Sequence, residues 1–138
     1  MGETDSLTGG CLCGAVRYKV SGEPAMAMAC HCTHCQKQTG SAFSTIAGWP
    51  ESQVELEGET RVYRDTGESG RVVDRKFCPQ CGSPLISAAE ASPGMLWIKT
   101  GTLDDPNAAA PKFHIWARSK QGWCETGALP AFDIMPEG

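Results

Sequence analysis

This sequence of 138 residues lacks the long hydrophobic runs that mark membrane proteins. No stretch approaches the roughly 18 consecutive apolar residues needed to cross a bilayer. Its first ten residues, MGETDSLTGG, are polar and acidic, which does not fit a secretory signal peptide. These absences predict a cytoplasmic protein that does not associate with membranes.

Basic charge is also scarce. Only 12 Lys and Arg residues stand against 16 Asp and Glu residues, the net charge is −4, and the basic residues form no run. A nucleic-acid-binding surface needs clustered cations that neutralise phosphates. We therefore expect no nucleic-acid partner.

Helical periodicity is missing as well, because no window of 12 or more residues repeats every 3.6 positions. The sequence thus predicts no helix beyond a turn or two near residues 33–38. Apolar and polar residues alternate in several short segments instead, and 16 Gly and 9 Pro residues suit many turns. The predicted strands cover residues 15–20, 54–56, 61–64, 71–74, 95–98 and 113–116. We expect an all-β protein, with residues 1–138 forming a single domain.

Cysteine is the residue type that the sequence has in excess, with eight in 138 positions. Seven of them fall into close groups, spaced as Cys11-x-Cys13, Cys30-x-Cys32-x-x-Cys35 and Cys78-x-x-Cys81. Disulfides usually join distant segments, whereas a metal site needs several soft ligands within about 4 Å of one another. A reducing cytosol also keeps thiols free. The grouping therefore predicts bound metal, with Zn²⁺ as the natural ion.

Spacing leaves two ways to divide the seven cysteines. The two C-x-x-C pairs alone would form a zinc-ribbon site from Cys32, Cys35, Cys78 and Cys81. Alternatively, a closed site uses Cys11, Cys13, Cys78 and Cys81, which leaves Cys30, Cys32 and Cys35 as a three-thiolate site with an open coordination position. The sequence pattern does not choose between them.

Longer motifs around these cysteines carry a family resemblance. The motifs are GGCLCGAV at residues 9–16, CHCTHCQKQTGSAF at 30–43 and FCPQCGS at 77–83, followed by GTLDDP at 101–106, HIW at 114–116 and LPAF at 129–132. In order and spacing they resemble the glutathione-dependent formaldehyde-activating enzyme family, also called the GFA or centromere protein V family. The resemblance spans nearly the whole chain.

The resemblance implies a β-tent fold, in which short antiparallel strands are tethered by zinc-binding loops, and two Zn²⁺ ions per chain. We expect residues 1–8 to form a flexible tail before this domain. The resemblance also implies the four-plus-three division, with a structural zinc on Cys11, Cys13, Cys78 and Cys81 and a catalytic zinc on Cys30, Cys32 and Cys35. The implied activity is that of a carbon–sulfur lyase that reversibly forms S-hydroxymethylglutathione from formaldehyde and glutathione.

The chemistry of such a reaction suggests where a substrate would bind. A free thiol has a pKa near 8.5, so its sulfur must be activated at neutral pH. Three thiolates on Zn²⁺ leave a formal charge of about −1, which favours holding a substrate thiol over polarising a carbonyl. The loop after Cys35 offers polar contacts for glutathione or a similar small thiol, through Gln36, Lys37, Thr39 and Ser41.

The alternative function is a non-enzymatic zinc-stabilised module that binds a protein, with both zincs structural and His31 or His34 closing the second site. Of the remaining candidates, we expect His114 to be a packed or hydrogen-bonded core residue and Cys124 a small buried apolar residue. We also expect the core to contain the aromatic residues Trp97, Trp116 and Trp123, with the alternative that one of them forms the wall of a pocket.

Overall fold

The structure is a computed structural model, and it describes residues 6–135. Within this range the chain forms ten strands, one α-helix and three short 3₁₀ helices. In chain order these are β1 (Ser6–Gly10), β2 (Arg17–Ser21), β3 (Met26–Cys30), α1 (Thr33–Thr39), β4 (Ser44–Pro50), η2 (Glu51–Gln53), β5 (Val54–Glu57), β6 (Arg61–Thr66), β7 (Val72–Phe77), β8 (Pro84–Ala89), β9 (Met95–Lys99), η3 (Thr100–Thr102), β10 (Phe113–Ile115) and η4 (Ala117–Ser119).

The all-β class with little helix is confirmed. Each predicted strand overlaps an observed one, and the helix of a turn or two expected near residues 33–38 is α1. Four strands were not predicted, namely β1, β3, β4 and β8. Three of these, with sequences MAMAC, STIAGWP and PLISAA, are nearly continuous apolar or small-residue runs. They do not alternate because both faces of their sheet are covered, so periodicity could not identify them.

The expected tail over residues 1–8 is wrong for residues 6–8. These residues begin β1, which pairs antiparallel with β2 in a register that places Leu7 opposite Val20. Backbone pairing and the packing of Leu7 against the core hold this segment in place. The rest of the expected tail, residues 1–5, lies outside the described range.

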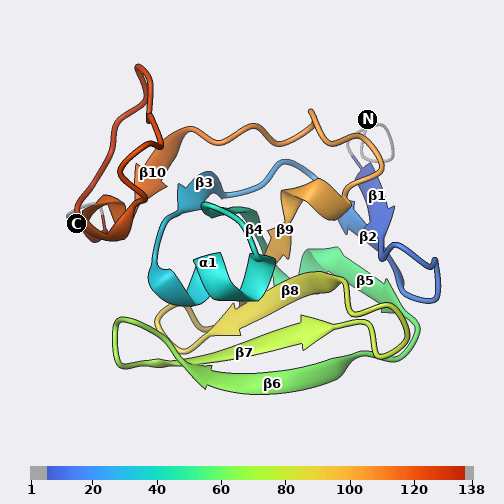
Figure 1. The fold of residues 1–138 in the computed structure, drawn as a ribbon. Helices are drawn as coiled ribbons and strands as arrows, with labels where there is room; N and C mark the ends of the chain where they lie inside the picture. Colours follow the sequence, from blue (N-terminus) through green and yellow to red (C-terminus); the bar gives the residue numbers. More distant parts are fainter. Residues whose placement is uncertain (1–5, 136–138) are drawn as a thin grey trace.

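The strands form two sheets (Figure 1). The small sheet has the order β1-β2-β5, and the large sheet has the order β10-β3-β4-β9-β8-β7-β6. All neighbouring strands run antiparallel except β10, which lies parallel to β3. A long connection after η3 crosses the molecule and returns the chain to β3, so the expected purely antiparallel arrangement has this one exception (Figure 1).

The two faces of the large sheet have different surroundings, because successive side chains of a strand point to opposite sides. On one face a row of cross-strand partners, Ala27, Ala47, Ile98 and Ile86, is buried in the main core together with residues of the small sheet. On the other face Met28 and Ile46 belong to a second core cluster, which contains Cys30, Cys32 and Cys35. Helix α1 lies over this second face (Figure 1).

Helix α1 is short because its ends are fixed by local chemistry. Cys32 caps its first turn, with Sγ accepting a hydrogen bond from the Cys35 N–H at 3.3 Å. The helix ends at Gly40, whose φ of 68° suits a residue without a side chain. No helix in the described part of the chain is long and apolar enough to span a membrane.

The central core position of the large sheet gives a first prediction. Ile98 is fully buried in the main core row, so Ile98→Ala should lower the free energy of unfolding by about 2–5 kcal/mol. Val62 on the edge strand β6 is 48% exposed, and Val62→Ala should change it by less than about 0.5 kcal/mol. Urea denaturation measures both, and similar losses in the two variants would contradict this core assignment.

Candidate metal centres

Four cysteines gather where the loop after β1 meets the loop after β7. The sulfur atoms of Cys11, Cys13, Cys78 and Cys81 all lie within 4.8 Å of one another. The Sγ–Sγ distance is 3.6 Å between Cys11 and Cys13 and 3.7 Å between Cys13 and Cys78. A tetrahedral ion with metal–sulfur bonds of about 2.3 Å holds its sulfurs about 3.8 Å apart, whereas a disulfide bond is about 2.05 Å long. The spacing therefore fits a metal ion.

Backbone groups around this four-cysteine cluster donate hydrogen bonds to two of its sulfur atoms. The Val16 N–H donates to Cys11 Sγ at 3.2 Å, and the Gln80 N–H donates to Cys78 Sγ at 3.3 Å. A hydrogen bond from the Ser83 hydroxyl lowers the pKa of Cys81 to about 5. The same Ser83 oxygen accepts the N–H of Leu12 at 3.0 Å, so it also joins the two loops.

The second group consists of three cysteines at the junction of β3 and α1. Cys30 ends β3, Cys32 caps the helix and Cys35 lies inside it. Their sulfur atoms lie within 4.8 Å of one another, and each residue is at most 7% exposed. The structure thus groups the cysteines as four plus three, not as the zinc-ribbon set that spacing alone also allowed. Chemically this three-cysteine cluster is a soft donor set suited to Zn²⁺.

Neither nearby histidine joins the three-cysteine cluster in the described part of the chain. The ring of His31 is fully buried, and its Nε2 lies 2.9 Å from Nδ1 of His114. His34 instead places Nδ1 2.9 Å from a carboxylate oxygen of Asp65. His114 is a buried, hydrogen-bonded residue as expected.

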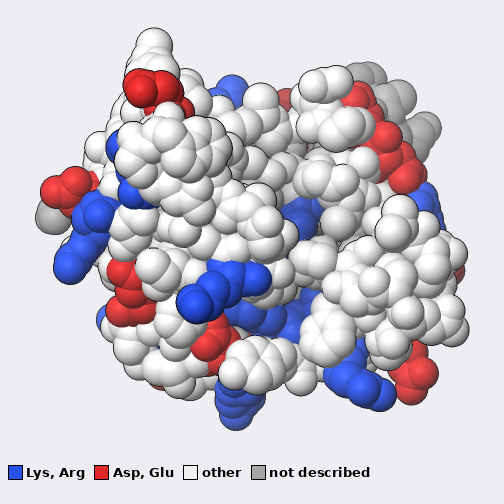
Figure 2. Space-filling model, viewed as in Figure 1, with Lys and Arg blue, Asp and Glu red and all other residues white. Residues whose placement is uncertain are grey.

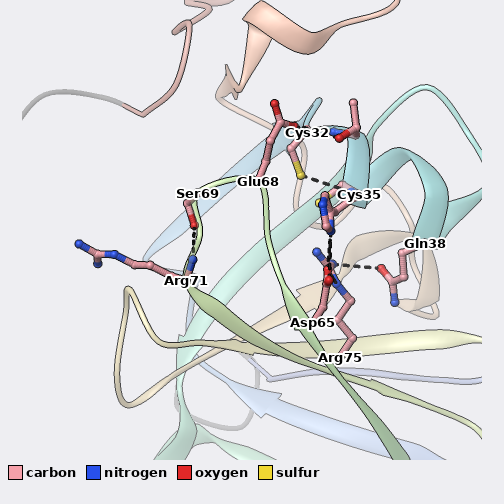
Figure 3. A network of polar contacts seen from close by, with 10 residues as sticks. Cys32, Cys35, Gln38, Asp65, Glu68, Ser69, Arg71 and Arg75 are labelled. Carbon is pink, nitrogen blue, oxygen red and sulfur yellow. Dashed lines mark hydrogen bonds and ion pairs between the residues drawn. The ribbon is translucent and has the colours of Figure 1, made fainter.

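Two buried cations accompany the three cysteines, and sequence reasoning missed both. Arg75 on β7 is 5% exposed, and its Nε donates to Asp65 at 3.0 Å. Figure 3 shows Arg75 and Asp65 below Cys35, with Gln38 of α1 reaching toward them. Lys99 at the end of β9 is 6% exposed. For Lys99, the sequence does offer one indication of burial, because this charged residue directly follows four apolar residues at the end of Met95–Lys99.

These surroundings polarise the three thiols unequally. Hydrogen bonds from Cys30 and Cys32 lower the pKa of Cys35 to about 2, and the charges of Lys99 and Arg75 act in the same direction. The pKa of Cys30 is raised, mainly by its hydrogen bonds with Cys32 and Cys35. Burial lowers the pKa of Lys99, and the charge of Cys35 opposes that shift. The hydrogen bond with Cys30 lowers the pKa of Cys32, but the hydrogen bond with Cys35 and burial outweigh it and raise that pKa to about 11. Negative charge is thus favoured on the sulfur of Cys35.

Three of the four predicted substrate contacts lie on the outer side of the α1 segment. Gln36, Lys37 and Ser41 line an open hollow of about 590 Å³, together with Thr33, Gly40, Ala42, Gln121 and Trp123. Cys35 is buried on the opposite side of the helix, as the helical repeat of 3.6 residues requires. Thr39 does not line the hollow, and its Oγ1 donates to the Cys35 carbonyl at 2.8 Å.

The segment after η4 completes this hollow. The indole N–H of Trp123 donates to Gln121 Oε1 at 2.7 Å, and Gln121 Nε2 donates to Gln36 Oε1 at 3.1 Å. Trp123 is 72% exposed, so its expected place in the core is wrong. It lines the hollow, where Gln121 holds its indole N–H. Cys124 is buried, as expected.

Two cysteine clusters on a two-sheet β fold define a candidate metal-binding β protein. Residues 6–119 match the family model of the glutathione-dependent formaldehyde-activating enzymes. The chain therefore belongs to this family.

Two individual proteins resemble the chain. One, from Halomonas elongata, is provisionally named a glutathione-dependent formaldehyde-activating enzyme and is 28% identical over 125 residues, which is 86% of this chain and 80% of that protein. The other is a Rhodobacter sphaeroides protein of known crystal structure. It shares the fold with a TM-score of 0.60 at 21% identity, covering 91% of this chain and 99% of that one.

The different positions of the two clusters predict different mutant phenotypes. Cys78→Ser should prevent stable folding, because a zinc ion held by the four-cysteine cluster would supply about 10–16 kcal/mol of apparent binding energy against a net stability of about 5–15 kcal/mol. Cys32→Ser should leave a folded protein that binds one zinc instead of two. Circular dichroism and zinc analysis per chain measure these outcomes.

The matched control is Cys124→Ser, which makes the same change at a buried cysteine outside both clusters. It should cost at most about 3 kcal/mol and leave zinc content unchanged. Equal loss of folding in Cys32→Ser and Cys78→Ser would show that both clusters are structural.

Proposed function

We propose that the protein is a zinc-dependent carbon–sulfur lyase that reversibly forms S-hydroxymethylglutathione from formaldehyde and glutathione, or acts on a similar small thiol. The observation that carries this proposal is the three-cysteine cluster. Its three sulfurs are close enough to share one ion, and no fourth side-chain ligand belongs to the cluster in the described residues. Family membership supports the same reaction class.

The residues of each cluster have distinct roles in this proposal. Cys11, Cys13, Cys78 and Cys81 hold a structural zinc, and Cys30, Cys32 and Cys35 hold a catalytic zinc. When bound at the second site, Zn²⁺ would lower the pKa of a substrate thiol in the fourth position so that the sulfur reacts as a thiolate. The thiol proton passes to solvent.

The reaction itself needs little from the protein beyond placing the sulfur. The thiolate sulfur attacks the carbonyl carbon of formaldehyde, a carbon–sulfur bond forms, and the carbonyl π electrons move to oxygen. That oxygen takes up one proton, which balances the proton lost by the thiol. Met28, Ile46 and Ile115 pack around the cysteines and provide an apolar environment that strengthens electrostatic effects on sulfur. The reverse reaction cleaves the same bond.

The hollow outside α1 offers room for the rest of the substrate. Its lining includes Thr33, the residue that directly follows Cys32 in the chain, but none of the three cysteines lines it. We propose that Gln36, Lys37 and Ser41 contact the carboxylates of glutathione there. Thr39 would act by orienting Ser41, since their hydroxyl oxygens lie 3.0 Å apart.

The non-enzymatic alternative needs a closed second site. The hydrogen bonds of His31 to His114 and of His34 to Asp65 direct both imidazoles to partners other than the cysteines. The geometry therefore favours the enzymatic proposal.

A selenium probe tests whether the substrate sulfur binds the metal. The selenol analogue of glutathione should show a zinc neighbour in selenium-edge X-ray absorption when mixed with the zinc-loaded protein. Cys32→Ser, which lacks one ligand of the second site, should abolish this signal. Absence of a zinc neighbour in the unmodified protein would sink the proposed thiol-binding role.

Kinetics test the proposed contact at Lys37. Lys37→Ala should raise KM for glutathione about three- to tenfold and leave kcat unchanged, because a contact far from the reacting atoms acts equally in ground and transition states. The matched control is Lys112→Ala, which removes another exposed lysine. An unchanged KM in Lys37→Ala would exclude this contact.

A further inference from the structure

Lys99 is a buried cation whose position is set by strand register. It pairs with Ile46 across β9 and β4, and so faces the same side of the large sheet as Ile46 and, two residues away, Ser44. Its Nζ donates to Ser44 Oγ at 2.7 Å. Ser44 lies directly opposite Cys30 in the pairing of β4 with β3. One hydrogen bond therefore separates the ammonium group from the residue beside Cys30.

No carboxylate neutralises this ammonium group. In residues 6–135 every ion pair involves other cations, and Lys99 forms none. The neighbouring cation Arg75 has its own partner, because its Nε lies 3.0 Å from Asp65. A buried lysine without a counter-charge is costly unless negative charge lies close by.

In Figure 2, which views the side on which α1 lies, some basic atoms lie in recessed places near the middle of the face. The groups left to balance Lys99 are the three thiols of Cys30, Cys32 and Cys35, all within the same buried region. Their attraction to Lys99 is among the interactions that act on this lysine.

We propose that Lys99 is the counter-charge of the three-cysteine cluster, where it strengthens metal binding and selects an anionic fourth ligand. Three thiolates and a divalent ion carry a net charge of −1, which the ammonium cancels. A thiolate in the fourth position raises the negative charge to −2, so the presence of Lys99 favours such a ligand over a neutral one. Lys99 is a positioning residue in this role and does not touch the reacting atoms. The inference rests on the proposed metal site.

The expected effect follows from the electrostatics of a partly buried pair. Two unit charges about 6 Å apart, at an effective dielectric constant of about 20, change an equilibrium constant on the order of 100-fold. Lys99→Met keeps the length and apolar stem of the side chain but removes the charge. It should weaken metal binding at the three-cysteine cluster about 10- to 100-fold.

The experiment keeps Zn²⁺ bound at the four-cysteine cluster of the full-length protein, titrates the three-cysteine cluster with Co²⁺ against a competing chelator, and reads the Co²⁺–thiolate absorption. The Zn²⁺ retained at the four-cysteine cluster is an internal control, and its content should stay unchanged in Lys99→Met. Lys112→Met, which removes an exposed lysine, should change neither the Co²⁺ affinity nor the Zn²⁺ content. Lys99→Arg keeps the charge and should recover most of the loss.

A second measurement separates charge from packing. With Co²⁺ in the three-cysteine cluster, Lys99→Met should lose at least tenfold in affinity for 2-mercaptoethanol, which binds as a thiolate. Its affinity for imidazole, which binds as a neutral ligand, should change less than twofold. A merely structural role would move both affinities equally.

The outcomes distinguish this inference from the proposed function. Unmodified protein with no metal at the three-cysteine cluster would overturn the proposed function and this inference with it. Normal metal binding in both the unmodified protein and Lys99→Met, with the same thiol preference, would overturn the role of Lys99 alone. Parallel weakening of both clusters in Lys99→Met would show a general folding defect and would likewise overturn that role.

Discussion

The approach of Cys13 to Cys78 is the contact on which the rest of the structure depends. These residues are 65 positions apart in the chain, yet their sulfurs lie 3.7 Å from each other. The contact fixes the loop of the small sheet to the loop that follows β7 of the large sheet, and the main core lies between the two sheets. Closing so long a loop is entropically costly, and a shared metal ion would offset that cost in one step. The sheet that supports the second cluster is positioned by this first one.

Because successive side chains of a strand point to opposite faces, the large sheet packs against the main core with one face and against the three cysteines with the other. Ala47 and Ile98 face the main core, while their neighbours Ile46 and Lys99 face the cysteines. A shift of one residue in the pairing of β4 with β9 would exchange these two sets. Core packing therefore keeps the register that places the ammonium group of Lys99 against Ser44, the residue of β4 that lies opposite Cys30. Packing on the face toward the main core thereby determines the geometry of the face toward the three cysteines.

The sequence alone predicted the features that depend on local spacing. Close-set cysteines indicated metal, and alternating segments indicated most of the strands. It did not reveal features that depend on long-range pairing, such as Lys99 lying beside the cysteines, or β3 and β4, whose apolar residues are buried on both faces. The expected core position of Trp123 was wrong because a tryptophan in the sequence is equally compatible with a core and with the rim of a pocket. The division of the cysteines needed either the family resemblance or the structure, since spacing permitted two arrangements.

Gln121 and Trp123 form part of the rim of the hollow beside α1. The family match ends at residue 119, so both rim residues lie beyond the part shared with the family model. They reach the rest of the protein through the side chain of Gln36, on the helix face opposite Cys35. Substitutions of Gln121 and Trp123 would change the shape of the hollow without changing any of the seven clustered cysteines. Under the proposed function, Gln121 and Trp123 would therefore affect which thiol is accepted, whereas the three cysteines would determine the reaction.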